Sequence, residues 1–584
     1  MSKMIMDHQH PLAQAVGAPA ANAVILISLV SLVYLAYRWA LPRPIPGIPY
    51  DESARASLFG SMPEIRAELA RTGRIRTWIV NHPRRHKSAL TQIWMGPLKK
   101  PTLILADFQE TQDILLRRNR EFDRSKRSLD IFAGPIGNHH IAMSSSDPRF
   151  KGNKELVRDL MTPNFLHDVS APQIYAKTMA LIDLWSWKAA VAQGRPFNAR
   201  RDIFDVAIDI INAVTFGLGE DMSTVKRQLD SLVSMESLDV TTEPNGSVHF
   251  PELPELPDIA AIHALGDHIG DQFKSMYPVF HHRYKVMMNK VLAQNIATKD
   301  RLIHEEIDKA VARLQTGQAQ TRSAMDHILQ REMNAASKAG REPVFHSERI
   351  HDELFGYIVA GHDTSSTALS WMVKNIADHQ DVQDRLRSAM RSAYPAAHAE
   401  KRQPTAIEIW KTSVPYLDAV LEESLRLDGP VPLTLRESVV DTELLGHKIP
   451  KGTSIFMISS GPDFLSPSIP VPDTARSDTS RAKYSYGRWN PEDMHLFRPE
   501  RWLRTDERGD EVFDAHAGPM MAFGLGPRGC FGRRLAYLET RIVLALLVWN
   551  FQFGELSGEF SSHAAHDKIT TNPEFCYVGL TKVQ

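Results

Sequence analysis

The sequence predicts a mainly α-helical protein with small β-sheets, preceded by one transmembrane helix. Apolar residues recur at helical spacing over long stretches after residue 105. Strand-like runs are few and short. One uncharged apolar run near the N-terminus is long enough to cross a bilayer.

The start of the chain predicts a membrane anchor. After a tail at residues 1–17, residues 18–41 read APAANAVILISLVSLVYLAYRWAL and carry no charge from Ala18 to Tyr37. About 20 helical residues at ~1.5 Å each span the ~30 Å hydrocarbon core. A cleaved signal peptide is the alternative, but small residues precede the apolar run instead of following it, which is the wrong order for cleavage. We therefore expect a single retained anchor.

The residues around this run predict its orientation. The flanking charges are basic after the run and mixed before it: Arg38 and Arg43 against Lys3 and Asp7. The positive-inside bias then places the long C-terminal part in the cytosol. Residues 42–49 carry four prolines, which cannot continue the helix and predict a stiff, extended spacer before the body at 50–584.

Helical and strand-like stretches alternate within the body. Helical periodicity is clearest at residues 108–122, 203–218, 355–373, 416–427 and 533–549. Strand-like runs occur at 101–107, 442–450, 452–459 and 574–580. Residues 241–258 interrupt two helical regions and could cover a pocket, touch the membrane or serve as a plain linker. Residues 461–488 are rich in Ser, Pro and Asp without apolar periodicity, so we expect a surface loop there.

Composition excludes several classes of function. The formal net charge of −1 and the pI near 7.1 give no global field that would draw the protein to nucleic acid. Two cysteines, Cys530 and Cys576, are too few for a secreted fold stapled by disulfides. No C-x-x-C pair, G-x-x-x-x-G-K-[ST] loop or G-x-S-x-G turn is present, which argues against a zinc cluster, a phosphate cradle and serine hydrolysis.

The segment FGLGPRGCFGRRLA, residues 523–536, places Cys530 at the end of a glycine-rich loop and directly before a predicted helix. Backbone N–H groups and the positive end of the helix dipole favour a thiolate at such a position. A thiolate is a soft metal ligand, and the surrounding glycines would let a flat macrocycle approach the backbone. A structural buried cysteine beside a tight turn is the alternative for an isolated cysteine.

The pattern Phe523-Gly524-x-Gly526-x-Arg528-x-Cys530-x-Gly532 resembles the haem-ligand loop of the cytochrome P450 superfamily. The resemblance implies haem b with the sulfur of Cys530 as the axial iron ligand. It also implies that Arg528 meets a haem propionate, that Phe523 packs beneath the porphyrin and that Gly532 makes room for it.

A second segment resembles the same family. In EESLRL, Glu423 and Arg426 are three residues apart and therefore lie on one helix face, where they can pair. FRPERW, residues 497–502, resembles the family segment whose arginine, here Arg501, joins that pair in a buried triad. The resemblance implies that this triad braces the cysteine loop and has a folding role.

The stretch 355–373 predicts a long core helix with a polar middle turn. Residues 361–367 contribute no large apolar side chain, so this turn is expected to lie against something flat or wet. The alternative is that its Ser and Thr side chains bond to backbone carbonyls and bend the helix. The motif AGHDT resembles the oxygen-binding groove of the family, which implies that Thr364 holds dioxygen and that Asp363 relays protons.

Two features depart from the family pattern. Where W-x-x-x-R is common, this chain has Phe150 and Lys154, and Lys154 could supply the charge for a propionate. We expect Arg436 to face a propionate as well. The loop at 461–488 is longer than usual for the family, which makes it an insertion.

The resemblance covers about residues 42–584 and implies a membrane-anchored haem-thiolate monooxygenase, similar to fungal enzymes of secondary metabolism. Such an enzyme inserts one oxygen atom of O2 into a lipophilic small molecule and releases the other as water. Its location would be the endoplasmic reticulum membrane, with one span and a cytosolic catalytic domain. Electrons would come from NADPH through cytochrome P450 reductase, with cytochrome b5 as a further partner, since no flavin, nicotinamide or iron–sulfur motif is present.

The reductase and the substrate would contact different parts of the chain. Basic residues could form a docking face for an acidic partner, or could be solvated charges without a common face: Arg528, Arg533, Arg534, Lys151, Lys154 and Arg158. By analogy with the family, the substrate would contact the mainly apolar segments 129–141, 357–360 and 431–435. Two other functions stay open, namely a haem-thiolate isomerase or dehydratase that needs no reductase, and a non-enzymatic haem sensor.

Overall fold

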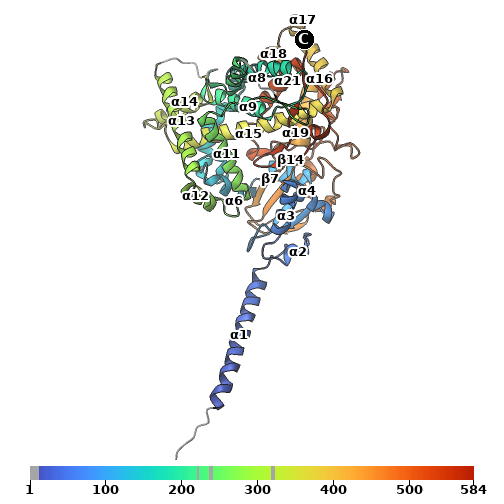
Figure 1. Cartoon of the computed structure of the whole chain (residues 1–584). Coiled ribbons are helices and arrows are strands. Elements are labelled where there is room, and N and C mark those ends of the chain that lie inside the picture. Colours follow the sequence, from blue (N-terminus) through green and yellow to red (C-terminus); the bar gives the residue numbers. More distant parts are fainter. Residues whose placement is uncertain (1–11, 220–221, 236–240, 317–321, 584) are drawn as a thin grey trace, which may run out of the picture.

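The computed structural model describes residues 12–219, 222–235, 241–316 and 322–583, and it has an elongated N-terminal helix attached to a mainly helical body (Figure 1). Helix α1 (Leu12–Ala40) begins earlier than the predicted span and leads away from the body. Its segment Asn22–Ala40 has a mean hydropathy of 1.8 and is long and apolar enough to cross a membrane. Residues 1–11 of the predicted tail lie outside the described residues.

The proline-rich spacer that follows is fixed to the body. Ile45 and Ile48 are buried. The amide of Gln92 accepts a hydrogen bond from the N–H of Ile45 at 2.8 Å and donates to the carbonyls of Ile45 at 2.9 Å and Ile48 at 2.6 Å. Prolines remove N–H donors from this extended segment, and the side chain of Gln92 pairs with three of the backbone groups that remain.

The largest sheet has five strands in the order β1 (Leu90–Ile93), β2 (Thr102–Leu105), β10 (Ser454–Ile458), β7 (Leu433–Ser438) and β3 (Phe122–Asp123). Strands β2 and β10 are parallel, and the other pairs are antiparallel. Side chains alternate between two apolar clusters: Leu103 and Leu105 pack on one face, and Ile104 packs on the other with Trp78 and Ile79 of α4 (Ile75–His86). Both faces are therefore covered, which explains the continuous apolar run.

Two of the predicted strands are in fact pairs of short strands. Residues 442–450 form the hairpin of β8 (Thr442–Leu444) and β9 (His447–Ile449), in which Leu445 and Gly446 have φ of 48° and 77°. Positive φ at both central residues is what a tight two-residue hairpin requires. Residues 574–580 likewise divide between β16 (Tyr577–Val578) and β17 (Leu580–Lys582), which belong to different sheets.

Smaller sheets complete the β-structure. Their strands are β4 (Phe197–Asn198), β5 (Thr241–Thr242), β6 (Val248–His249), β11 (Leu503–Thr505), β12 (Glu511–Phe513), β13 (Phe551–Phe553), β14 (Ala565–Asp567) and β15 (Thr571–Pro573). Strands β5 and β6 come from the interrupting segment 241–258, and Phe250 after them is buried against Phe197, with ring centroids 5.6 Å apart. Part of this segment is thus built into the body.

Helix α15 (Glu348–Asp378) runs through the middle of the helical region (Figure 1). It packs on α9 (Arg200–Phe216), α21 (Arg533–Asn550) and α19 (Pro415–Asp428), which agree with the predicted helical stretches. Nearly every residue of α9 is buried, since helices cover it on several sides. The same arrangement gathers the largest apolar cluster around α15.

The remaining helices surround this centre. They are α2 (Glu52–Arg55), α3 (Met62–Thr72), α5 (Phe108–Leu116), α6 (Lys126–Ala133), α7 (Pro148–Val157), α8 (Ala171–Ala192), α10 (Thr224–Ser234), α11 (Pro257–Lys274), α12 (Pro278–Met288), α13 (Lys290–Gln315), α14 (Ala324–Lys338), α16 (Gln380–Ala393), α17 (Pro395–Ala399), α18 (Ala406–Lys411) and α20 (Asp478–Lys483). The predicted helix 108–122 is wrong beyond Leu116. Residues 117–121 are not helical, and Phe122 begins β3, where it pairs with Ser438 in the sheet, so tertiary pairing overrides the local periodicity there.

The segment 461–488 lies against α5 and contains α20. Arg476 forms a bidentate ion pair with Asp107, the N-cap of α5, at 2.6 and 2.7 Å. Ser477 and Thr479 donate hydrogen bonds to Asp113 of the same helix at 2.7 and 2.8 Å. These contacts fix the segment in one conformation.

Candidate functional site

The cysteine loop joins the short 3-10 helix η7 (Gly526–Arg528) to α21. The N–H of Cys530 donates to the carbonyl of Phe523 at 2.7 Å and closes the loop. Gly524 and Gly526 have φ of 60° and 71°, a region that favours glycine. A Cβ on Gly526 would lie 1.9 Å from the carbonyl oxygen of Leu115, so this glycine is also needed where the loop packs on α5.

Two opposing effects act on the Cys530 thiol. Burial raises its pKa, while hydrogen bonds from the N–H groups of Gly532 and Arg533 and the charge of Arg533 lower it. The start of α21 thus lowers the pKa of the Cys530 thiol, as the sequence predicts, but burial raises this pKa by more. The residue is nevertheless exposed to the space beside the loop, so its sulfur is available to a ligand.

Three arginines from separate elements meet near the loop. Arg436 of β7 and Arg528 of η7 are buried, and Arg124 follows β3. Burial and mutual repulsion lower the pKa of Arg124 to about 9 and that of Arg436 to about 10. Among the described residues, Asp123 is the carboxylate that partly offsets this charge. The site therefore has an excess of buried positive charge.

This arginine cluster has unused hydrogen-bond donors. Arg528 donates to the carbonyl of Met143 at 2.7 Å through Nη2, but its buried Nη1 and the buried Nε of Arg124 have no partner among the described residues. Buried donors normally have acceptors. An anionic ligand with two carboxylates beside Cys530 would satisfy both the charge and the donors, and haem b carries two propionates. The residues present therefore fit haem.

Lys154 and Phe150 take part in the same region from α7. Lys154 donates through Nζ to the carbonyl of Pro527 at 3.2 Å and thereby ties α7 to the cysteine loop. The guanidinium of Arg528 lies 4.2 Å from the ring centroid of Phe150, and the Lys154 ammonium lies 5.6 Å from it. The structure thus places Lys154 beside Arg528, where burial and that arginine lower its pKa.

Phe523 packs on the helix that follows the cysteine. Its ring centroid lies 5.0 Å from that of Tyr537 and 5.9 Å from the guanidinium of Arg533. Tyr537 in turn donates to the carboxyl of Glu422 at 2.5 Å. Aromatic contacts of this kind hold the loop against the first turns of α21.

The groove predicted on α15 combines close packing with an open side. A Cβ on Gly361 would lie 2.5 Å from Cδ1 of Ile211, so the glycine lets α9 approach α15. On the other side, Ala360 is exposed and Thr364, one turn later, is partly exposed, although most residues around them on this helix are buried. These two positions share a helix face that borders an accessible space.

Asp363 and Thr364 have different hydrogen-bond partners. Thr364 donates through Oγ1 to the carbonyl of Ala360 at 2.7 Å, which is the back-bonding alternative. Asp363 accepts a hydrogen bond from Thr570 at 3.1 Å. Burial raises the pKa of Asp363, and the neighbouring His362 partly counters this effect. Asp363 therefore retains its proton to a higher pH than an exposed aspartate does.

Sequence reasoning missed one residue near this groove and one residue of the arginine cluster. Glu539 of α21 accepts a hydrogen bond from Ser365 at 2.8 Å, and burial raises the pKa of its carboxyl to about 8. Arg124, the third arginine of the cluster, is the other missed residue. Neither belongs to a motif; the one available signal for Glu539 was a carboxylate on a helix whose later turns are mainly apolar.

The predicted triad forms in the structure. Glu423 receives two hydrogen bonds from Arg426, both at 2.8 Å, and one from Nε of Arg501 at 2.9 Å. Trp502 donates to the same carboxylate at 2.9 Å. Arg426 also donates to the carbonyl of Phe464, so the triad is linked to the start of the segment 461–488. Breaking such a fully buried network leaves charges unpaired.

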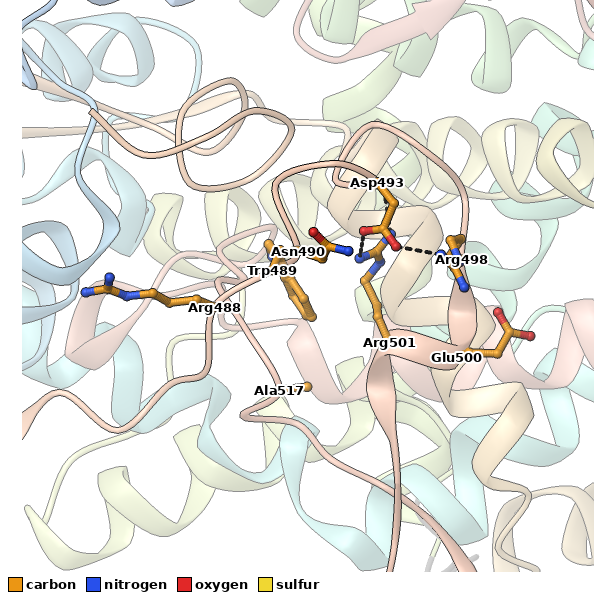
Figure 2. Close-up of a pocket in the computed structure, with 8 residues that line it drawn as sticks. All are labelled: Arg488, Trp489, Asn490, Asp493, Arg498, Glu500, Arg501 and Ala517. Atoms are coloured by element: carbon orange, nitrogen blue, oxygen red, sulfur yellow. Dashed lines mark hydrogen bonds and ion pairs between the residues drawn. The ribbon is translucent and has the colours of Figure 1, made fainter. Parts of the chain in front are cut away.

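An open cavity of about 290 Å³ lies beside this triad (Figure 2). Figure 2 shows Arg498 and Arg501 turned toward Asp493, with distances of 2.6 and 3.0 Å, whereas Arg488 points away. The charged side chains that line the cavity are thus largely paired with one another. None of its lining residues belongs to the cysteine loop or to α15, so we assign it no part in the reaction.

The proposed docking face needs one correction. Arg528 is buried and belongs to the arginine cluster, so it is not on the surface. Four other basic residues of that set are exposed: Lys151, Arg158, Arg533 and Arg534. Arg534 donates to the carbonyl of Met161, which brings α21 close to the chain after α7.

Comparisons with known proteins agree with this site. The cytochrome P450 family profile matches residues 55–461 and 490–574, so the match is interrupted at the segment we interpret as an insertion. Cytochrome P450 monooxygenase TRI13 of Fusarium sporotrichioides is 36% identical over 96% of this chain and 98% of its own length. Cytochrome P450 monooxygenase xilC of Penicillium rubens is 36% identical over 93% of each chain.

A solved structure supports the same fold. A crystal structure of a cytochrome P450 superposes with a TM-score of 0.62, at 17% identity, and covers 93% of this chain and 99% of that chain. The mainly helical architecture with small sheets is thus that of the family. The chain belongs to the cytochrome P450 family and is a cytochrome P450 monooxygenase.

Proposed function

We propose that this monooxygenase inserts one oxygen atom of O2 into a lipophilic small molecule of a specialised biosynthetic pathway. The observation that carries the proposal is the convergence of an accessible Cys530 with a cluster of arginines whose charge Asp123 only partly offsets and whose buried donors are not all satisfied. A relative from Dothistroma septosporum, 40% identical over 48% of this chain and 96% of its own length, is named for the Hps1-dma1 cluster, which suggests a clustered pathway here too.

The residues that would hold haem b follow from this geometry. The sulfur of Cys530 would bind the iron, and Arg124, Arg436 and Arg528 would bind the propionates, with Lys154 beside them. When bound through a thiolate, haem supplies cleavage of the O–O bond. Phe523 and Gly532 would lie next to the sulfur, and the N–H groups of Gly532 and Arg533 would temper its charge.

Asp363 and Thr364 would deliver protons. Burial raises the pKa of Asp363, whose carboxyl accepts a hydrogen bond from Thr570, a residue that lies beside the C-terminal strands. Thr364 borders the accessible side of α15 and can turn its hydroxyl from the carbonyl of Ala360 to a bound reactant. A positioned acid and hydroxyl of this kind supply general acid catalysis.

The substrate would lie along the apolar segments 129–141, 357–360 and 431–435. A cavity of about 110 Å³ is lined by Gly134 and Pro135 of the first segment, by Leu265, Ile296 and Phe355, and by the polar residues His268, His282 and Lys299. Apolar contacts with a few polar anchors suit a lipophilic ligand.

Two surfaces suit the expected partners. The exposed basic residues Lys151, Arg158, Arg533 and Arg534 would receive the acidic face of cytochrome P450 reductase, which passes electrons from NADPH; cytochrome b5 could use the same face. On the side of the body from which α1 leaves, the region of α12 exposes large apolar side chains, including Phe280 and Met287, at 70% and 74% (Figure 1). With α1, this surface supports a cytosolic domain held on the endoplasmic reticulum membrane.

The test is expression of the full chain with a reductase in a eukaryotic host, followed by spectroscopy and product analysis. The reduced enzyme with carbon monoxide should give the absorption band of thiolate-bound haem, and Cys530→Ser should lose it. Mass spectrometry should detect a product heavier by one oxygen atom. Turnover without any reductase would instead identify an isomerase or dehydratase, and failure to consume NADPH with any lipophilic substrate would identify a haem sensor.

A further inference from the structure

Three histidines meet on the outside of the body, away from the cysteine loop in the fold. His304 lies on α13, His346 lies just before α15, and His351 lies in the first turns of α15. One ligand nitrogen from each lies within 4.8 Å of the others. The rings of His304 and His346 are stacked, with centroids 3.8 Å apart.

The surroundings of these histidines point to a missing partner. Nε2 of His351 is buried and has no hydrogen-bond partner among the described residues. Asp308, one turn after His304, lies 2.9 Å from Nε2 of His346 and 3.6 Å from Nε2 of His304. Three imidazoles therefore converge, one of them with an unsatisfied nitrogen, and one carboxylate contacts two of the three.

The charges near the cluster leave room for a cation. Asp300 and Lys299 both act on His351, and they form an ion pair with each other at 2.5 Å, so the cation of Lys299 is offset. Asp308 then supplies a negative charge that contacts two of the imidazoles.

Two other clusters of titratable groups in the described residues differ in their carboxylates, although Nε2 of His82 in the first is also buried without a hydrogen-bond partner. In the first, Asp51 accepts from His86 at 3.0 Å and also from Arg85 at 2.9 Å, so a metal would have to replace a guanidinium. In the second, Glu353 already accepts from His140, at 2.8 Å, and from Asn153, at 2.9 Å. Neither carboxylate is free for a cation.

We propose that His304, His346, His351 and Asp308 bind one divalent transition metal ion, with zinc as the best match to the donor set. Three imidazole nitrogens and one carboxylate oxygen form a typical tetrahedral zinc site, with bonds of about 2.0–2.2 Å. To bind one metal ion, the ligand atoms must move closer to one another. The side chains of His304 and His346 are 55% and 35% exposed, which leaves them free to make this movement.

A metal at this position would join two helices that matter for the enzyme. It would bind α13 to the N-terminal end of α15, the helix that carries Asp363 and Thr364. A ligand that binds only the folded state stabilises that state by mass action. The site is independent of haem, so the proposal does not rest on the reaction proposed above.

The test measures zinc binding to the purified, haem-loaded full chain after treatment with a chelator. Isothermal titration with zinc chloride should give one tight site per chain, and the zinc X-ray absorption spectrum should show nitrogen and oxygen neighbours at about 2.0 Å. His351→Ala and the double variant His304→Ala, His346→Ala should weaken the affinity by more than about tenfold, since even partners of metal ligands contribute that much. Asp308→Asn should weaken it less.

The control is His495→Ala, which removes an exposed histidine elsewhere on the surface and should leave binding unchanged. The haem spectrum of each variant verifies folding. Zinc that binds with equal affinity after His351→Ala, or no tight binding by the unaltered chain, would overturn the proposal.

Discussion

The hydroxyl of Ser365 on α15 donates a hydrogen bond to the carboxyl of Glu539 on α21 over 2.8 Å. This contact joins α15, the helix that carries Asp363 and Thr364, to α21, the helix that begins after Cys530. The second carboxyl oxygen of Glu539 is buried and has no partner among the described residues. Burial raises its pKa from 4.5 to about 8, so this acid is mainly protonated at neutral pH.

We predict that Glu539→Gln flattens the pH dependence of stability. Between pH 4.5 and about 8 the folded state binds more protons at Glu539 than the unfolded chain does, so this residue lowers stability as the pH rises through that window. At alkaline pH the amide, which cannot ionise and still accepts from Ser365, should stabilise the variant by on the order of 4 kcal/mol. Thermal unfolding of the haem-loaded enzyme from acid to alkaline pH measures this difference.

The matched control for this prediction is Glu555→Gln, since Glu555 is exposed. It should leave the pH dependence as in the unaltered enzyme. A Glu539→Gln variant whose unfolding temperature runs parallel to that of the unaltered enzyme would contradict the buried neutral acid.

Glu423→Gln should destabilise the protein strongly. The carboxylate is fully buried and receives hydrogen bonds from Arg426, Arg501 and Trp502. Its neutralisation leaves the buried Arg426 without its anion and leaves Arg501 with Asp493 alone. Breaking a buried pair costs about 3–5 kcal/mol. The yield and unfolding temperature of the haem-loaded enzyme report this loss.

The comparison variant is Glu511→Gln, which breaks the exposed ion pair with Arg385 of 2.7 Å. It should cost less than about 1 kcal/mol. Equal effects of the two substitutions would mean that the triad does not brace the fold.

Arg124→Met should accelerate loss of haem. The substitution removes one of the three cations that we assign to the propionates, but it leaves the cysteine loop intact. Removal of one partner from a buried charge pair costs about 2 kcal/mol or more, which corresponds to about thirtyfold faster dissociation. Transfer of haem to an excess of apomyoglobin gives the rate, with the exposed Arg120→Met as the control. An unchanged rate would exclude Arg124 from the haem site.

Thr364→Ala should uncouple electron consumption from product formation. The hydroxyl now bonded to Ala360 would no longer assist proton delivery, so product per NADPH should fall by at least about tenfold with little change in KM. Thr364→Ser should recover much of the coupling. Ser370→Ala, which removes a similar back-bond to Ser366 on the same helix, should have no such effect. If both alanine variants couple equally well, Thr364 acts only on the helix backbone.

The sequence alone determined the features that depend on local chemistry. Fixed spacing identified the cysteine loop, the Glu423–Arg426 pair and the polar turn of α15, and an uncharged run identified α1. It also located the segment 461–488, where the family match is interrupted. These features could be predicted because each is encoded within a few neighbouring residues.

The tertiary structure decided what depends on distant segments meeting. Pairing with β7 placed Phe122 in a strand, and packing against Leu115 explains Gly526. Arg124 and Arg436 are far apart in the sequence, yet both meet Arg528 beside the cysteine. Sequence periodicity carries no information on such encounters, because burial and charge depend on which elements the fold brings together.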